Sequence, residues 1–377
     1  MKWWFGRKAA RGAGRPFLFG GWGVGVGGEP WPRSYEARVR EAYLGNPIAQ
    51  RAVRLVADSV AWAPVYGLEE GRDGPSTGSG RTVHLVTPSL LEAVATHLLL
   101  HGNAFVRVIE DGDGVPAELF ALRPERVAIE ADARGWPAAY RYKVKDATSR
   151  IAARDGLGRP GVVHLRFAHP LDDHYGLGCL GAAAPAVHNA AAAWNKALLD
   201  NAARPSGALV YEPGDGAALS TEQFERLRGE MEARFSGSGN AGRPMLLEGG
   251  LRWQAMSLTP ADMEFSELKA AAAREIALAF GVPPLLLGLP GDATYANYKE
   301  ANRALWRLTV LPLAEKILRG LGDALGAWWP GLRLAIDVDQ VTALAEDRER
   351  LWAQVNAAGF LSDGEKREML GFGPAKE

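Results

Sequence analysis

The chain has 377 residues, of which 47% are hydrophobic and 23% charged, and this composition excludes a wholly disordered protein. Lys and Arg number 43 against 44 Asp and Glu, so the chain lacks the basic excess typical of proteins whose main task is to hold phosphate backbones. The single cysteine, Cys179, excludes a disulfide framework and a cysteine-rich metal site, and no apolar run reaches the ~20 residues of a membrane-spanning helix.

The N-terminal segment is basic and shows neither a helical nor a strand period. Residues 1–54 carry ten basic and three acidic side chains, and residues 6–33 are rich in Gly, Pro and Arg. We therefore predict a flexible basic arm over residues 1–44. A solvated tail and a contact with nucleic acid or an acidic protein surface are both compatible with this arm.

Two helices and a sheet are predicted next. Asn46 and Pro47 form a helix start, and Pro64 stops that helix. Ser89 opens a second helix, and Gly102 ends it. Five runs with a period of two follow, separated by tight turns: residues 104–110, 117–122, 126–130, 139–144 and 162–167. The predicted fold class is therefore α+β, with an antiparallel sheet.

The middle of the chain after this sheet is mainly helical. A helix is predicted over residues 180–203, and a strand follows at residues 208–211. Ser220 and Gln223 form a capping box that opens another helix, which ends near Phe235. Two short strands are predicted after it: residues 244–248 and 251–258.

The C-terminal third holds two long predicted helices. The first covers residues 259–281 and is opened by Thr259 with a proline behind it. After a loop, the second covers residues 297–325 and contains Pro312, which should kink it. A strand at residues 332–338 and a short helical tail complete the predicted elements.

One stretch could carry enzyme chemistry. His169–His174 places two imidazoles and two carboxylates within six residues, in a loop rich in Pro and Gly. A metal-dependent nuclease using Asp172 and Asp173 is one interpretation, and a loop that only leads into the next helix is the other. The sequence has no Walker A motif, and prolines follow its Gly-rich run at residues 23–28, where a dinucleotide site would need a helix. We therefore predict no enzyme, no cofactor and no metal site.

Four motifs follow one another in the rest of the chain: HYGLGCLGAAAPAVHNA at residues 174–190, EIALAFGVPPLLLG at 275–288, TYANYKEANRALWRLTVLP at 294–312 and GFLSDGEKREMLGFGP at 359–374. In this order they resemble the HK97-type phage portal family over roughly residues 40–374. The small size of the chain also resembles the portal of a gene transfer agent. The resemblance implies a portal fold and a homo-oligomeric ring, expected to be a dodecamer. That ring would occupy one capsid vertex of a virion or gene transfer agent particle assembled in the bacterial cytoplasm.

The resemblance also implies partners and a division into parts. Double-stranded DNA enters through such a ring, driven by the large terminase subunit, and later leaves through the tail. The expected protein partners are therefore the terminase large subunit, a head–tail adaptor protein and the major capsid protein, with no membrane. The implied parts are a basic N-terminal arm (1–44), a wing (45–178), a first stem helix (179–203), a clip (204–258), a second stem helix (259–281), a tunnel loop (282–297), a kinked helix that completes the wing (298–340) and a short crown (341–377).

Three sets of site residues follow from this resemblance and from the charge pattern. Residues 259–300 are acidic overall, which suits a channel that lets DNA slide, because many phosphate contacts would brake it. A solvated face that bridges subunits explains the same charges equally well. The residues expected to line the channel are Lys269, Arg274, Leu289, Pro290, Asp292, Tyr295 and Lys299. The residues of the clip expected to dock the terminase and the adaptor are Glu222, Glu225, Arg226, Arg228 and Glu232. The residues expected to pack one subunit on the next are Phe265, Leu268, Ala272, Ile276 and Phe280.

A capsid or scaffold component of the same particle is a further interpretation, beside the portal and the nuclease. It predicts shells or large irregular assemblies, whereas a portal predicts a closed ring.

Overall fold

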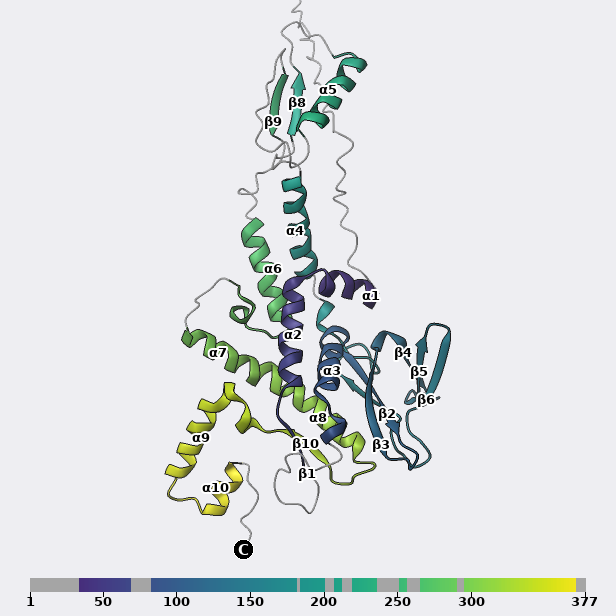
Figure 1. Cartoon of the computed structure of the whole chain (residues 1–377), viewed down its shortest axis with the longest axis vertical. Coiled ribbons are helices and arrows are strands. Elements are labelled where there is room, and N and C mark those ends of the chain that lie inside the picture. Colours follow the sequence, from purple (N-terminus) through teal and green to yellow (C-terminus); the bar gives the residue numbers. More distant parts are fainter. Residues whose placement is uncertain are drawn as a thin grey trace, which may run out of the picture. The chain divides into compact units, whose positions relative to one another are not determined.

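The computed structural model describes residues 34–68, 83–181, 184–200, 207–211, 219–235, 251–255, 265–289 and 295–370. The chain divides into two compact units, Met1–Pro30 with Ala190–Leu268 and Trp31–Asn189 with Lys269–Glu377. Figure 1 draws the elements of both units in sequence colours. Both helices and antiparallel sheets are present, which confirms the predicted α+β class.

The larger unit begins with a helix that the sequence analysis assigned to the basic arm. Helix α1 (Tyr35–Arg38) continues into the π-helical turn η1 (Val39–Leu44). The Ser34 hydroxyl caps α1 by accepting a hydrogen bond from the Ala37 N–H at 3.2 Å. The predicted arm of residues 1–44 is therefore wrong at its end, because Tyr35 and Val39 pack against the core and hold this segment helical. Residues 1–33 lie outside the described part of the chain.

The first two predicted helices are present as α2 (Pro47–Ala61) and α3 (Pro88–His101). Asn46 caps α2 as predicted. Thr87, and not Ser89, caps α3, since its side chain accepts a backbone hydrogen bond from the first turn. Gly102 ends α3 with a φ of 82°, a left-handed conformation that favours glycine.

The strands of this unit form three small antiparallel sheets among the described residues. Their orders are β3 (Pro116–Leu122), β2 (Asn103–Glu110), β7 (Val162–Arg166); β4 (Val127–Ala131), β5 (Pro137–Val144), β6 (Ala147–Ala152); and β1 (Val65–Leu68), β10 (Arg333–Ile336). The five strands predicted between residues 104 and 167 are confirmed. The sequence analysis missed β1 and β6. Strand β6 is almost wholly exposed and lacks an apolar alternation, and β1 is only four residues long and pairs with a strand far along the chain.

One core joins the helices of the larger unit. Val53 of α2, Leu98 of α3 and Ile317 of α8 (Leu311–Leu325) are fully buried in it. The kink predicted at Pro312 takes the form of a π-helical turn, η7 (Trp306–Val310), between α7 (Tyr295–Leu305) and α8. Pro312 is the second residue of α8, directly after η7, and because proline has no N–H to bond a carbonyl of the preceding turn, it favours this break in the α-helical hydrogen-bond pattern.

The predicted C-terminal strand and helical tail are also present. After β10, the chain forms α9 (Ala345–Ala357) and α10 (Asp363–Met369). Val341 and Leu344, just before α9, are each 3% exposed and belong to the core of the unit. Ser362 and Glu365 form a capping box at the start of α10.

The smaller unit contains the segment between the two predicted stem helices. Strands β8 (Gly207–Tyr211) and β9 (Leu251–Ala255) pair antiparallel, and α5 (Thr221–Phe235) lies between them in the sequence. The predicted capping box of α5 is confirmed: the Gln223 N–H donates to the Ser220 hydroxyl at 3.2 Å, and the Ser220 N–H donates to the Gln223 side chain at 3.0 Å. The predicted strand at residues 244–248 and the predicted helix start at Thr259 lie outside the described residues.

The two predicted stem helices correspond to α4 (Ala184–Asp200) and α6 (Phe265–Ala279). Each runs across the boundary between the two units in the sequence. Among the helices of the described ranges, none has both the length and the apolar content that crossing a bilayer requires.

Candidate functional site

The candidate site is the segment from α6 through the predicted tunnel loop to α7. Helix α6 ends at Ala279, and Gly281, two residues further on, has a φ of 65° that favours glycine. The Thr309 hydroxyl of η7 donates a hydrogen bond to the Gly281 carbonyl oxygen at 2.6 Å. A Cβ atom at position 281 would lie 2.7 Å from that hydroxyl. The end of α6 is therefore tied to the π-helical turn that precedes α8.

The first part of the predicted tunnel loop is anchored. Pro284–Leu287 forms a short 3₁₀ helix, and Leu286 and Leu287 pack against the core. Gly288 ends it in a left-handed conformation with a φ of 73°. The loop thus leaves the core from a defined base. Of its predicted channel residues, Leu289 is half-buried, and Pro290 and Asp292 lie outside the described residues.

The predicted channel cations have different surroundings. Lys269 is half-buried near His188 of α4, and burial together with the charge of Lys269 lowers the pKa of His188. Arg274 is exposed on α6. Lys299 forms an ion pair with Glu346 of α9. The backbone of Tyr295 begins α7, and its side chain is outside the described set.

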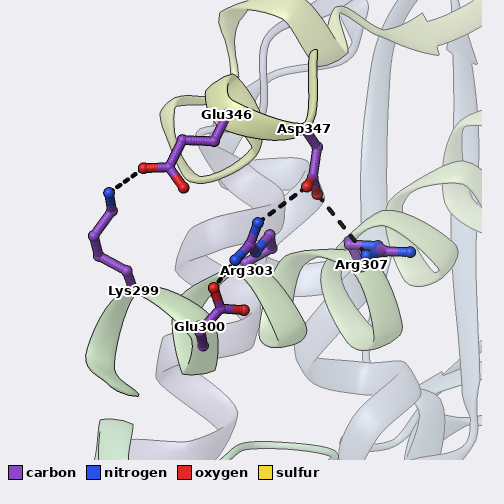
Figure 2. A network of polar contacts seen from close by, with 6 residues as sticks. All are labelled: Lys299, Glu300, Arg303, Arg307, Glu346 and Asp347. Atoms are coloured by element: carbon purple, nitrogen blue, oxygen red, sulfur yellow. Dashed lines mark hydrogen bonds and ion pairs between the residues drawn. The ribbon is translucent and has the colours of Figure 1, made fainter. Parts of the chain in front are cut away.

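Figure 2 shows the ion pairs that join α7 and η7 to the first turn of α9. Besides the Lys299–Glu346 pair, Arg303 contacts Glu300 and donates to Asp347 at 3.1 Å. Arg307 lies 3.9 Å from the same Asp347 carboxylate. The lysine that the sequence analysis assigned to DNA is therefore neutralised by the chain itself. No sequence signal indicated this pairing, because its partners are 47 residues apart.

A polar cluster that the sequence analysis missed fixes the start of α4. Asn46 is fully buried, and its side-chain oxygen accepts the N–H groups of Ile48 and Ala49 at 3.1 and 3.0 Å. Its Nδ2 donates to the side-chain oxygen of Asn189 in α4 at 2.9 Å, and Asn189 in turn donates to the Glu41 carbonyl at 2.9 Å. One asparagine thus caps α2 and holds α4 beside η1. The Asn-Pro pair in the sequence predicted only the capping role.

The HYGLG motif has a packing role. Asn103 is fully buried and accepts the Gly176 N–H at 2.7 Å. A Cβ atom at position 176 would lie 2.1 Å from the Gly102 carbonyl oxygen, and one at position 178 would lie 2.5 Å from the Leu100 carbonyl oxygen. The segment after β7 therefore passes so close to the end of α3 that only glycine fits.

The possible metal ligands before this motif form a turn. The Asp172 carboxylate accepts the N–H groups of His174 and Tyr175 at 2.7 and 2.9 Å, and these hydrogen bonds lower its pKa. Within the described ranges, no three His, Cys, Asp or Glu side chains converge as metal ligands would. This geometry favours the interpretation of His169–His174 as a structural loop.

The predicted subunit-packing stripe on α6 needs correction. Ala272, Ile276 and Phe280 are 3%, 0% and 3% exposed in the single chain, and Ile276 and Phe280 belong to its own core. Buried side chains of this kind have no surface left for a neighbouring subunit. Leu268, at 45% exposure, keeps such a surface, and the side chain of Phe265 is outside the described set.

Two leucines at the C-terminal end of α6 are exposed instead. Leu278 is 79% exposed, and Leu308 of η7 is 78% exposed. Leu278 lies one turn before Gly281, and Leu308 adjoins Thr309, so the Thr309–Gly281 hydrogen bond brings their backbones to the same end of the helix.

The predicted docking residues of the clip lie on α5. Glu222, Glu225 and Arg226 are exposed, Arg228 is half-buried, and the side chain of Glu232 is outside the described set. Arg226 pairs with Glu230 at 3.4 Å and Arg228 with Glu225 at 3.7 Å, along the same helix. Exposed pairs of this kind contribute little to stability.

Three half-buried histidines of the larger unit have lowered pKa values. Burial lowers the pKa of His97, His101 and His164 from 6.5 to about 4 in each case. The His164 ring stacks on Phe105 with ring centres 4.3 Å apart. All three side chains are therefore neutral at pH 7.

The free energy of unfolding is expected to fall as the pH drops from about 6.5 towards about 4, and to be nearly flat between about pH 7 and about pH 8. In the acidic window the unfolded chain binds protons that these histidines of the folded chain do not. The fall is at most about 1.4 kcal/mol per pH unit for each histidine. Urea denaturation across this range measures it, and His97→Leu should reduce the slope. An unchanged slope in that variant would contradict the assignment.

Comparisons with known proteins place this geometry among related chains. The model of the family described as phage portal protein matches residues 47–371. An uncharacterised protein of Rickettsia felis is 42% identical over 355 residues, which cover 89% of this chain and 88% of that protein.

Two solved structures are similar as well. The first is a chain in the neck of a native gene transfer agent particle, a structure computed with C12 symmetry. It is 48% identical with a TM-score of 0.66, and the match covers 92% of this chain and 96% of the neck chain. An HK97 family phage portal protein from Corynebacterium diphtheriae shares the fold, with a TM-score of 0.54 at 19% identity, covering 82% of this chain and 96% of its own.

Proposed function

This chain belongs to the phage portal protein family, and we propose that twelve copies of it form a closed ring at one vertex of a phage or gene transfer agent capsid. The ring is the passage through which the large terminase subunit drives double-stranded DNA into the particle, and through which the DNA leaves towards the tail. Its other neighbours are a head–tail adaptor and the major capsid protein. The observation that carries this proposal is the 48% identity to a chain of the gene transfer agent neck, over nearly the whole of both chains.

The parts of the ring follow the elements of the chain. The wing comprises α2, α3 and the three sheets of the larger unit. Helices α4 and α6 form the stem. The clip, which meets the terminase and the adaptor, comprises α5, β8 and β9. The mixed charges of Glu225, Arg226 and Arg228 support this role, because exposed ion pairs suit reversible and salt-sensitive docking.

The contact between subunits includes Leu278 and Leu308. Both are exposed, large and apolar, and they lie at the same end of α6. A ring buries the same patch twelve times, so even a modest apolar contact contributes repeatedly. Ile276 and Phe280 act differently, as the core that holds α6 in each subunit.

Light scattering and electron microscopy of the purified protein test the proposal. A portal gives a closed ring with a mass of twelve 40.5-kDa chains. Shells or irregular assemblies would favour a capsid or scaffold component instead. Metal-dependent cleavage of plasmid DNA that Asp173→Ala abolishes would favour a nuclease.

Asp292→Arg is expected to leave ring assembly unchanged and to slow packaging or retain DNA in the particle. Twelve added cations in the tunnel loop would bind phosphates, and the effect should weaken as salt rises. Packaging assays with purified particles at low and high salt measure it. Asp146→Arg, in an exposed turn of the wing, is the matched control. Wild-type packaging rates and DNA release for Asp292→Arg at low salt would remove this loop from the channel.

A further inference from the structure

Three cations lie in a row along α7 and η7. Lys299, Arg303 and Arg307 are four residues apart, so successive side chains stand about 6 Å apart along one helix face. Figure 2 shows this row facing two carboxylates of α9, Glu346 and Asp347. The row begins four residues after the start of α7, whose first residues overlap the end of the predicted tunnel loop (282–297).

The outer members of the row lie at the surface. The side chain of Lys299 is 47% exposed and that of Arg307 is 64% exposed. Arg303 is only 12% exposed, and it holds Asp347 in place at 3.1 Å while also contacting Glu300. Arg307 is thus already largely exposed beside Asp347, displacing Glu346 would open Lys299 further, and Arg303 would stay covered.

Apolar contacts also attach the start of α9. Val341 and Leu344, directly before this helix, are each 3% exposed in the core of the unit. Pairs with exposed members such as Lys299–Glu346 add little to stability. Five charged residues at one contact therefore call for an explanation other than holding the fold together.

We propose that Lys299 and Arg307 form a binding row for the phosphates of double-stranded DNA, and that Glu346 and Asp347 occupy this row so that DNA is not held. Lysine and arginine bind carboxylates and phosphates through the same charge-assisted hydrogen bonds, so the two acids stand where phosphates would bind. The choice of DNA as the ligand rests on the proposed function. A passage for sliding DNA works best when cations beside it are neutralised by the protein, because each phosphate contact adds salt-dependent affinity.

The test compares the wild-type protein with Glu346→Gln/Asp347→Asn in binding to a short fluorescent DNA duplex. The variant is expected to bind more tightly at low salt. If two cations are freed, the ratio of the variant's DNA affinity to that of the wild type should fall about tenfold when the salt concentration rises from about 50 to about 200 mM. Adding Lys299→Gln and Arg307→Gln to the variant should abolish the gain. Glu349→Gln/Glu368→Gln, which removes two exposed acids of α9 and α10 outside the network of Figure 2, is the charge-matched control.

Three results would overturn the proposal: equal affinity of wild type and variant, a gain that survives the loss of Lys299 and Arg307, or an equal gain in the charge-matched control. Equal affinity together with faster proteolysis of α9 would identify the network as a structural clamp. Thermal unfolding of every variant checks that the chains compared are folded. Because the assay uses purified protein, its result is read separately from ring formation and packaging, which test the proposed function.

Discussion

Leu278→Asp is expected to yield a folded chain that no longer assembles into rings. Leu278 is 79% exposed in the single chain, so the substitution costs little there. In a ring, the apolar contact of the leucine would be lost, and the aspartate would place an unpaired charge between two subunits. The two effects together cost several kcal/mol per subunit contact. Light scattering should report monomers or small oligomers, and the melting temperature of the monomer should stay close to that of the wild type.

Leu157→Asp is the matched control, because Leu157 is 75% exposed in a turn between β6 and β7. It should assemble normally.

Ala272→Glu distinguishes the contact proposed from the structure, at Leu278, from the contact predicted from the sequence, which included Ala272. Since Ala272 is 3% exposed within one chain, a glutamate there should destabilise the fold itself, and not assembly alone. Normal rings from Leu278→Asp would remove this end of α6 from the subunit contact.

Gly176→Ala is expected to destabilise the larger unit by about 3 kcal/mol or more, because the added methyl group overpacks a site closed by backbone. Its Cβ would lie 2.1 Å from the Gly102 carbonyl oxygen and 2.8 Å from the backbone of Phe167. The Phe167 N–H donates to the Gly102 carbonyl oxygen at 2.9 Å, so neither neighbour can move without disturbing this hydrogen bond. Urea or thermal denaturation measures the loss.

Gly156→Ala provides the comparison for this variant. A Cβ at position 156 meets no atom within 4 Å, so the free energy of unfolding should change by at most about 0.5 kcal/mol. Similar stability of the two alanine variants would contradict the packing role assigned to the HYGLG motif.

Local signals determined much of the secondary structure. Asn46 with Pro47, Ser220 with Gln223, and Gly281 each mark a helix end through a hydrogen bond or a φ angle that depends on a few neighbouring residues. Such signals can be recognised in a sequence because they involve residues close together in it. The order of the four motifs likewise indicated the portal family, which the family match over residues 47–371 confirms.

Only the tertiary structure decided which faces and charges are free. The helical period of α6 predicts that Ile276 and Phe280 share a face with Leu268, but it does not say whether the chain or a neighbouring subunit covers that face. The core of the larger unit covers Ile276 and Phe280, and leaves Leu278 exposed. Leu278 lies off the predicted stripe, so the sequence pattern gave no reason to choose it.

Lys299 also shows that a sequence pattern does not reveal the tertiary partner of a side chain. In the sequence it is a cation beside a predicted DNA channel, whereas in the structure it is paired with Glu346, 47 residues further along the chain. Helix periodicity and capping act over a few residues, but an ion pair between α7 and α9 depends on how the intervening α8 and β10 fold back. The sequence by itself therefore determined the elements and the family, and the packing of distant segments decided which residues each surface presents.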